Sequence, residues 1–238
     1  MSTNAQTPEA DSGGPNWKVF GIVALFGAGL VASGLLRYFH LRDEDPSALT
    51  GYATIIYVGL TILAAVLLRR SEVPMRRLGF GLAFKPARFL LLAAVGVGLI
   101  QLAGLMLEPF WESVFGGSRD LARFSDVAGT PVELLKLMAL NWTIAAFGEE
   151  LAFRIVLMRG VAFALGDSRK AFGVALIVQA VVFGLVHIYQ GPAGIFGAAI
   201  NGLIFGGLTL AARGSIWPAA IAHGSSNSIG IMQLYWAS

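Results

Sequence analysis

Long apolar segments recur along this chain from residue 17 to the C-terminus. They lie at about 17–37, 51–68, 89–108, 132–149, 171–189, 194–212 and 215–236. Each is close to the ~20 residues that an α-helix needs to cross the hydrocarbon core of a bilayer. Lipid offers the backbone no hydrogen-bond partner, so segments of this kind span as helices. The sequence therefore predicts an all-α, multi-pass transmembrane helical bundle with seven or eight spans.

The stretch 150–165 does not fit one span simply. It is apolar but contains Arg154 and Arg159. It is either an interfacial helix or the continuation of the helix before it. A straight helix over 132–165 would be about 50 Å long, well beyond the ~30 Å of the hydrocarbon core. A break or a strong tilt is therefore expected.

Composition supports the membrane assignment. Hydrophobic residues make up 56% of the chain and charged residues 13%, and the mean hydropathy is +0.71. Soluble domains are far more charged. The absence of cysteine excludes disulfides and thiolate metal ligands. Residues 1–16 are polar and rich in small residues, which predicts a disordered tail and not a cleaved signal.

The basic residues indicate topology and argue against a nucleic-acid partner. The net charge is +3 and the pI is near 9.4, but six of the seventeen basic residues crowd one loop: Arg69, Arg70, Arg76, Arg77, Lys85 and Arg88. Loops rich in Lys and Arg stay in the cytoplasm. This places the N-terminus inside and residues 38–50 and 109–131 outside. The C-terminus lies outside with seven spans and inside with eight. We expect an integral protein of a bacterial inner membrane.

Ionisable side chains inside apolar segments are costly, so they are candidates for function. The first group is Glu149, Glu150 and Arg154. Glu150 and Arg154 are four apart and share a helix face, where they can pair, whereas Glu149 points about 100° away. A carboxylate in such a place can act as a general base on water. The alternative is an ion pair at a helix end without a catalytic role.

A second candidate is His187, four residues after Phe183 in an apolar segment. Gly184 and the sequence Gly191-Pro192 predict a helix end nearby. The ring would then lie beside an accessible cavity. The alternative is a structural histidine.

The third group is His223 and Asn227, which are four apart in the last apolar segment and share a helix face. Both can donate hydrogen bonds to a developing oxyanion. The alternative is hydrogen bonding between helices, a common use of polar residues in membrane bundles.

Together these groups can activate water directly or hold a divalent ion that does so. The H-E-x-x-H and G-x-S-x-G signatures are absent. His40 falls in a charged stretch and is assigned no role. The remaining polar residues within spans are read as packing or inter-helix hydrogen-bond residues: Gln101, Asn141, Trp142, Gln179 and Asn201.

The constellation resembles the CPBP family of intramembrane proteases, which includes the CAAX-processing Ras-converting enzymes and bacterial proteins linked to bacteriocin immunity. Its E-E-x-x-x-R, F-x-x-x-H and H-x-x-x-N/D motifs are matched in order by Glu149-Glu150…Arg154, Phe183…His187 and His223…Asn227. The match covers roughly residues 130–230. One departure is Ile155, where many members have glycine.

The resemblance implies a helical bundle that encloses a catalytic cavity open to the cytoplasmic side and to lipid. Residues 17–129 would supply N-terminal helices and 130–238 the catalytic core. Glu149 and His187 would position and deprotonate the attacking water.

The resemblance also assigns the remaining residues. His223 and Asn227 would bind the oxyanion, and Glu150 and Arg154 would support the site. The family is described both as glutamate-dependent and as metal-dependent. Zn²⁺ or another divalent metal would be held by Glu149, His187 and His223.

The expected function is an intramembrane endopeptidase acting on a peptide or membrane-protein substrate at the bilayer surface. A prenylated CAAX-type C-terminus and a leader peptide are both options for the substrate. A non-catalytic membrane scaffold or immunity protein on the same fold is the alternative. A small transporter or proton relay is a third reading, disfavoured because the spans show no repeated halves.

Overall fold

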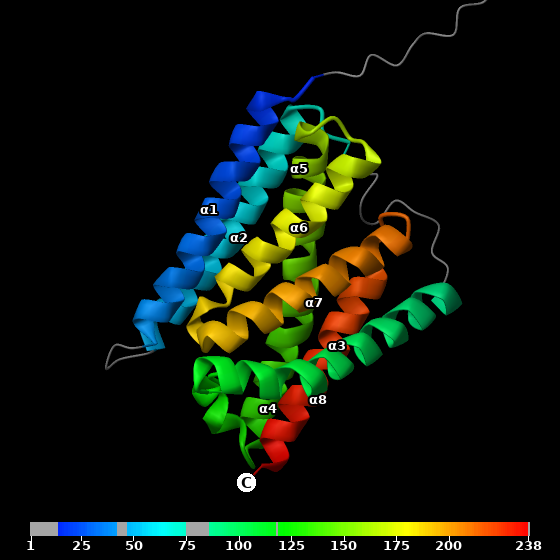
Figure 1. Ribbon diagram of the computed structural model, residues 1–238. Helices are drawn as coiled ribbons and strands as arrows, with labels where there is room; N and C mark the ends of the chain where they lie inside the picture. The colour runs from blue at the N-terminus through cyan, green and yellow to red at the C-terminus, as the bar shows by residue number, and fades with distance from the viewer. Residues whose placement is uncertain (1–13, 42–46, 75–85, 118, 238) are drawn as a thin grey trace, which may run out of the picture.

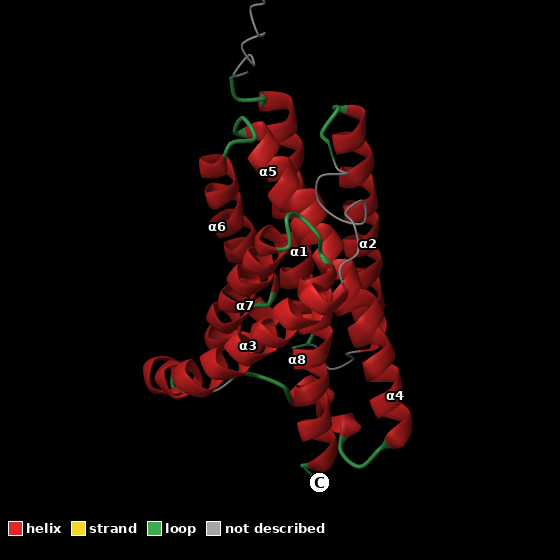
Figure 2. Cartoon of the chain, turned by 90° about the vertical axis from the view of Figure 1, so that its right-hand side faces the viewer, coloured by secondary structure: helices red, strands yellow, loops and turns green. Residues whose placement is uncertain are grey.

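A computed structural model describes residues 14–41, 47–74, 86–117 and 119–237, and their regular secondary structure is entirely helical (Figures 1 and 2). The predicted all-α class is confirmed for this part of the chain. The elements of the described residues follow in this order: α1 (Trp17–His40), α2 (Ser47–Arg70), α3 (Pro86–Phe115), η2 (Ala122–Val127), α4 (Pro131–Leu140), η3 (Asn141–Glu149), η4 (Leu151–Met158), α5 (Arg159–Ala164), α6 (Arg169–Val186), η5 (Ile188–Gln190), α7 (Gly191–Ala211) and α8 (Trp217–Trp236). Most of the expected tail lies outside the described residues.

Five helices in the described ranges are long and apolar enough to cross a membrane. They are α1, the Tyr52–Arg70 part of α2, α3, α6 and the Ile188–Ala211 stretch that contains α7. Spans were also expected at 132–149 and 215–236, but the helix over 131–164 and α8 are not among these five. Both contain the polar residues of the candidate site, which lower their hydropathy. The chain is therefore an integral membrane protein by its five apolar helices, with fewer clear spans than expected.

One helical path continues from α4 to α5 without the expected break. Glu150, at the junction of η3 and η4, has φ −63° and ψ −36°, which is ordinary helical backbone. No proline interrupts the path after Pro131, and η3 and η4 have the wider π-helical winding. Figure 1 shows this green helix behind α6 and α7. Residues 150–164 thus continue the preceding helix, which was one of the two alternatives predicted.

The two ends of the bundle are tied by backbone hydrogen bonds. At one end the amide of Asn16, just before α1, donates to the carbonyl of Ala164 at the end of α5 (2.9 Å). The amide of Gly129, just before α4, donates to the carbonyl of Tyr235 at the end of α8 (3.0 Å). The start of α1 and the end of α8 lie at opposite ends of the molecule (Figure 1).

Two ionisable residues outside the candidate site are buried. His40 is the last residue of α1 and is buried, not part of a charged loop, because α1 continues three residues past Arg37. Arg159, in the apolar stretch 150–165, is fully buried. Its guanidinium pairs with both carboxylate oxygens of Asp167, in the turn before α6.

Glycine allows α6 and α7 to pack closely beside the site. A Cβ placed on Gly184 would lie 2.6 Å from the carbonyl oxygen of Ile195 and 2.9 Å from the Cβ of Ala199. Neither atom belongs to a flexible side-chain end, so the helices would have to move apart. Gly173, on the same helix, has no atom within 4 Å of the same position.

We therefore expect Gly184→Ala to lower the free energy of unfolding by about 1–3 kcal/mol through overpacking. Gly173→Ala is the matched control and should be neutral or stabilising by up to about 1 kcal/mol, since alanine is the better helix former. Thermal unfolding in detergent measures both. Equal stability of the two variants would contradict the close contact.

Candidate active site

A buried ion pair forms the base of the site. Nε of Arg154 lies 3.0 Å from Oε2 of Glu150, and neither side chain is exposed. The pairing predicted from their spacing is confirmed. Arg154 also donates from Nη2 to the carbonyl of Gly202 on α7 (3.3 Å). This pair links the long helix to α7 in the interior of the protein.

His223 joins this pair from α8. Its Nδ1 donates to Oε1 of Glu150 at 3.1 Å, and its ring stacks on Phe205 of α7 with centroids 4.5 Å apart. Because a carboxylate only accepts, Nδ1 bears the proton. The other ring nitrogen, Nε2, lies 3.9 Å from Oε2 of Glu149. The order Arg154–Glu150–His223–Glu149 is thus a connected chain of charged and polar groups.

Glu149 is the accessible end of this chain. Its side chain is 18% exposed, whereas Glu150 is fully buried. The hydroxyl of Tyr57, on α2, donates to the carbonyl of Gly148 (3.3 Å) and holds the backbone just before Glu149. The two carboxylates thus differ in burial, since Glu150 is enclosed and Glu149 is partly exposed; their separate roles stay predictions.

His187 follows the last residue of α6, where a helix end was predicted. Its Nδ1 donates to the carbonyl of Phe183 at 2.7 Å. A neutral ring held in this way keeps the lone pair on Nε2, so Nε2 is the atom that can accept a proton or orient water. The ring is half-buried.

Phe183 fills the space between the two histidines. Its ring centroid lies 4.8 Å from that of His187 and 6.0 Å from that of His223. It also lies 5.1 Å from the guanidinium carbon of Arg154. The phenylalanine of the F-x-x-x-H motif thus packs against three of the candidate residues.

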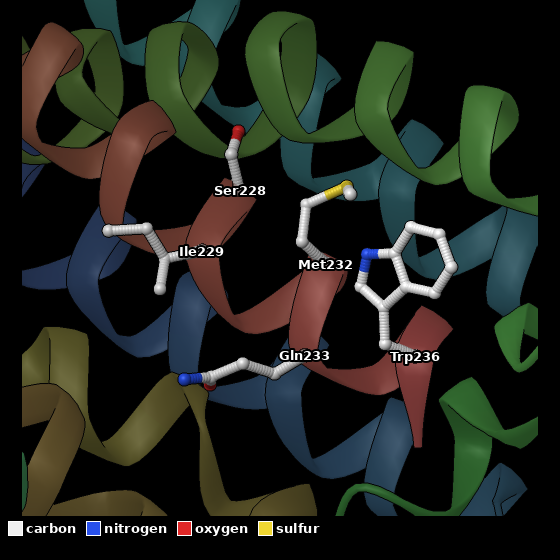
Figure 3. A pocket seen from close by; sticks show the side chains of 5 residues that line it. All are labelled: Ser228, Ile229, Met232, Gln233 and Trp236. Carbon is white, nitrogen blue, oxygen red and sulfur yellow. The ribbon is translucent and has the colours of Figure 1, made fainter. Parts of the chain in front are cut away.

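Asn227 is the candidate that the structure does not join to the others. It lies one turn after His223 on α8, is exposed, and makes no side-chain hydrogen bond within the described ranges. The next residues of α8 line a shallow pocket formed by Ser228, Ile229, Met232, Gln233 and Trp236 (Figure 3). Asn227 is therefore exposed just before the residues of α8 that line this pocket.

The predicted metal ligands do not assemble into a metal site. Within the described part of the chain, no group of three His, Cys, Asp or Glu side chains is arranged to hold a metal ion. Nδ1 of His223 and Nδ1 of His187 are both engaged in hydrogen bonds, which leaves Nε2 of each ring as the atom that could bind a metal. Metal binding by Glu149, His187 and His223 stays a prediction, and no chemical step is derived through a metal.

Three further polar residues support the site. Gln179, expected as an inter-helix hydrogen-bond former, donates to the carbonyl of Gly202 (2.9 Å), the same acceptor that Arg154 uses. Asn141 donates to the carbonyl of Gly224 (2.9 Å) and so ties η3 to α8 beside His223. Tyr57 was not identified from the sequence, since nothing local distinguishes it from other span tyrosines.

Comparison with known proteins adds one match. Residues 131–229 match the family model described as type II CAAX prenyl endopeptidase Rce1-like. This range begins with α4 and ends within α8, and it contains every residue of the candidate site except Tyr57. No curated protein and no solved structure matches the chain.

Proposed function

We propose, from the match of residues 131–229 to the Rce1-like family of type II CAAX prenyl endopeptidases, that the chain hydrolyses a peptide bond within the membrane with water activated by Glu149. The observation that carries the proposal is the partial exposure of Glu149, at the end of the chain of contacts that runs from Arg154 through Glu150 and His223. A structural ion pair alone does not require a second, partly exposed carboxylate beside it.

The first step is attack by water. Glu149, as general base, takes one proton from water while Nε2 of His187 orients the same molecule. The water oxygen then bonds to the scissile carbonyl carbon, and the carbonyl oxygen becomes an oxyanion. The C–N bond breaks in the second step, and the leaving amine takes its proton from Glu149. The carboxylate is thereby regenerated.

The oxyanion needs donors that are already in place. Nε2 of His223 can donate to it when the ring carries a second proton, since Nδ1–H is committed to Glu150. The amide of Asn227, on the same face one turn away, is the second proposed donor. Glu150 and Arg154 fix the ring of His223 and take no direct part.

We further propose seven membrane crossings. The five apolar helices are joined by the long helix over 131–164 and by α8, whose polar residues face the interior and not lipid: Glu150, Arg154 and His223 are buried. Seven crossings place the two ends of the chain on opposite sides, in agreement with the positions of α1 and α8.

Two expectations from the sequence conflict: that the basic loop is cytoplasmic, and that the catalytic cavity opens to the cytoplasm. The C-terminal end of α1 lies beside His187, since a Cβ on Gly34 would approach the carbonyl oxygen of Val186 to 2.5 Å. The opposite end of the bundle carries Arg69, Arg70, Arg169 and Lys170. Three other members of the basic loop, Arg76, Arg77 and Lys85, lie outside the described residues. If the basic end is cytoplasmic, the site is nearer the other face. We propose this orientation in place of a cavity open to the cytoplasm.

The absence of native cysteine makes the orientation directly testable. Single cysteines would replace Ser71, after α2 at the basic end, and Ser113, near the end of α3 at the other end. We expect a membrane-impermeant maleimide to label Ser113→Cys in intact cells and Ser71→Cys only after permeabilisation. The reverse pattern would put His187 on the cytoplasmic side.

Cleavage of peptides by the purified protein in detergent tests the activity itself. Quenched peptides with and without a prenyl group would separate a CAAX-type substrate from a leader-like one. The described residues form no three-ligand metal group, and the proposed step does not use a metal. We therefore expect a chelator or added Zn²⁺ to change the cleavage rate less than about twofold. Loss of activity in chelator, restored by Zn²⁺, would overturn the glutamate mechanism.

The alternative of a non-catalytic scaffold or immunity protein predicts no cleavage by the wild type. It also predicts that a cellular phenotype survives substitution of Glu149 but not packing changes such as Gly184→Leu. The buried charge chain is common to both readings, so the accessibility of Glu149 is the feature that favours the enzyme.

A further inference from the structure

Two arginines outside the family motifs lie beside the site. Arg37 is three residues from the end of α1, and its guanidinium carbon lies 5.1 Å from the ring centroid of Tyr189. The Tyr189 ring in turn lies 5.8 Å from that of His187. Arg37 interacts electrostatically with both Glu149 and His187. It is a cation at the catalytic centre for which the proposed reaction has no use.

Arg119 approaches the same place from the segment after α3. The amide of the next residue, Asp120, donates to the carbonyl of Gln190 (3.1 Å) and fixes this segment against η5. The guanidinium of Arg119 packs over Gly197 on α7, where it would meet an added Cβ. Arg119 also interacts electrostatically with His187. Both arginines therefore lie on the His187 side of the site.

Both guanidiniums have hydrogen-bonding capacity that the described residues leave unused. Nε of Arg37 and Nε of Arg119 are buried without a partner. Neither arginine has an ion-pair partner in the described ranges, and the one side-chain hydrogen bond of Arg37 is a 3.4 Å contact from Nη2 to Thr54. Buried donors of a cation that lack a partner are costly. An anion bound between η5 and α1 would satisfy them.

We infer that Arg37 and Arg119 bind the free C-terminal carboxylate of the peptide substrate and so set the position of cleavage relative to the chain end. The inference rests on the proposed peptidase function. Guanidinium groups match a carboxylate in charge and in paired hydrogen-bond geometry. A substrate that is cleaved near its chain end presents this carboxylate whatever its sequence, whereas an acidic side chain would restrict the substrates to particular sequences.

The test compares three peptides that share one sequence: a free C-terminal carboxylate, a C-terminal carboxamide, and a carboxamide with one glutamate introduced near its end. Each is assayed with wild type, Arg37→Gln, Arg119→Gln and the control Lys136→Gln, an exposed cation on α4. Wild type and control should prefer the free carboxylate by about tenfold to a hundredfold in kcat/KM, mainly through KM. Arg37→Gln and Arg119→Gln should reduce this preference to below about threefold, the worth of a weak exposed charge contact.

Four results overturn the inference. Equal cleavage of the carboxylate and carboxamide peptides by wild type would contradict binding of the C-terminal carboxylate by Arg37 and Arg119 (the carboxylate clamp), while the peptidase proposal would stand. Full recovery by the glutamate peptide assigns the arginines to an acidic side chain instead. Equal loss of kcat on both peptides in the variants makes the arginines electrostatic supports of Glu149. Absence of any cleavage by wild type overturns the peptidase proposal, and the clamp with it. The wild-type comparison decides even if a variant fails to fold.

Discussion

Glu149→Gln is expected to lower kcat/KM at least about a hundredfold, because a positioned general base contributes about 10²–10⁴ in rate. Glutamine keeps the size and the hydrogen-bonding capacity of the side chain but cannot take a proton from water. The side chain is partly exposed and only 3.9 Å from Nε2 of His223, so the loss should fall on kcat with little change in KM. Initial rates on a quenched peptide measure it.

Glu133→Gln is the matched control for this substitution. Glu133 lies earlier on the same helical path, is exposed, and pairs with Lys136 at 2.7 Å. Its replacement removes the same charge at a distance from the site and should leave kcat/KM within about twofold, as expected for an exposed ion pair. If Glu149→Gln retained most of the wild-type rate while remaining folded, Glu149 would not be the base.

Hydropathy was sufficient to predict the apolar helices, but it predicted less well the helices that carry the candidate catalytic residues. α1, α3 and α7 are long, apolar and free of charged side chains in their centres, so lipid alone dictates their structure. The helix over 131–164 carries Glu149, Glu150 and Arg154, of which Glu150 and Arg154 pair with each other and both carboxylates face His223 of another helix. The helix continues through Glu150 because of this packing, which the comparison of helix length with bilayer thickness did not include.

Contacts of the site within one helix could be predicted from the sequence, whereas contacts between helices could not. The Glu150–Arg154 pair follows from helical spacing, because both residues belong to one turn. The contact of Glu150 with His223 joins positions 73 residues apart, and only the crossing of α8 with the long helix creates it. His223 was paired in the sequence with Asn227, but its nearest partners are carboxylates. Tyr57 and Arg37 reach the site from helices with no motif at all.

The second large effect concerns stability. Arg154→Met is expected to destabilise the protein by about 3–5 kcal/mol, because it leaves the fully buried carboxylate of Glu150 without its cation. Glu150→Gln alone leaves the buried guanidinium of Arg154 without its anion and should lower the stability by a similar amount. Lys136→Met breaks an exposed pair and should change stability by no more than about 1 kcal/mol. Thermal or denaturant unfolding in detergent would rank the three variants.

The double variant Glu150→Leu with Arg154→Met separates folding from catalysis. Apolar side chains of similar volume remove both buried charges, so most of the lost stability should return. Nδ1 of His223 would nevertheless lose its acceptor, and the ring would no longer be fixed opposite Glu149. We therefore expect a folded protein whose kcat/KM stays at least about tenfold below wild type, as for other lost orienting partners of a histidine. Recovery of both stability and activity would show that the buried pair serves the fold alone.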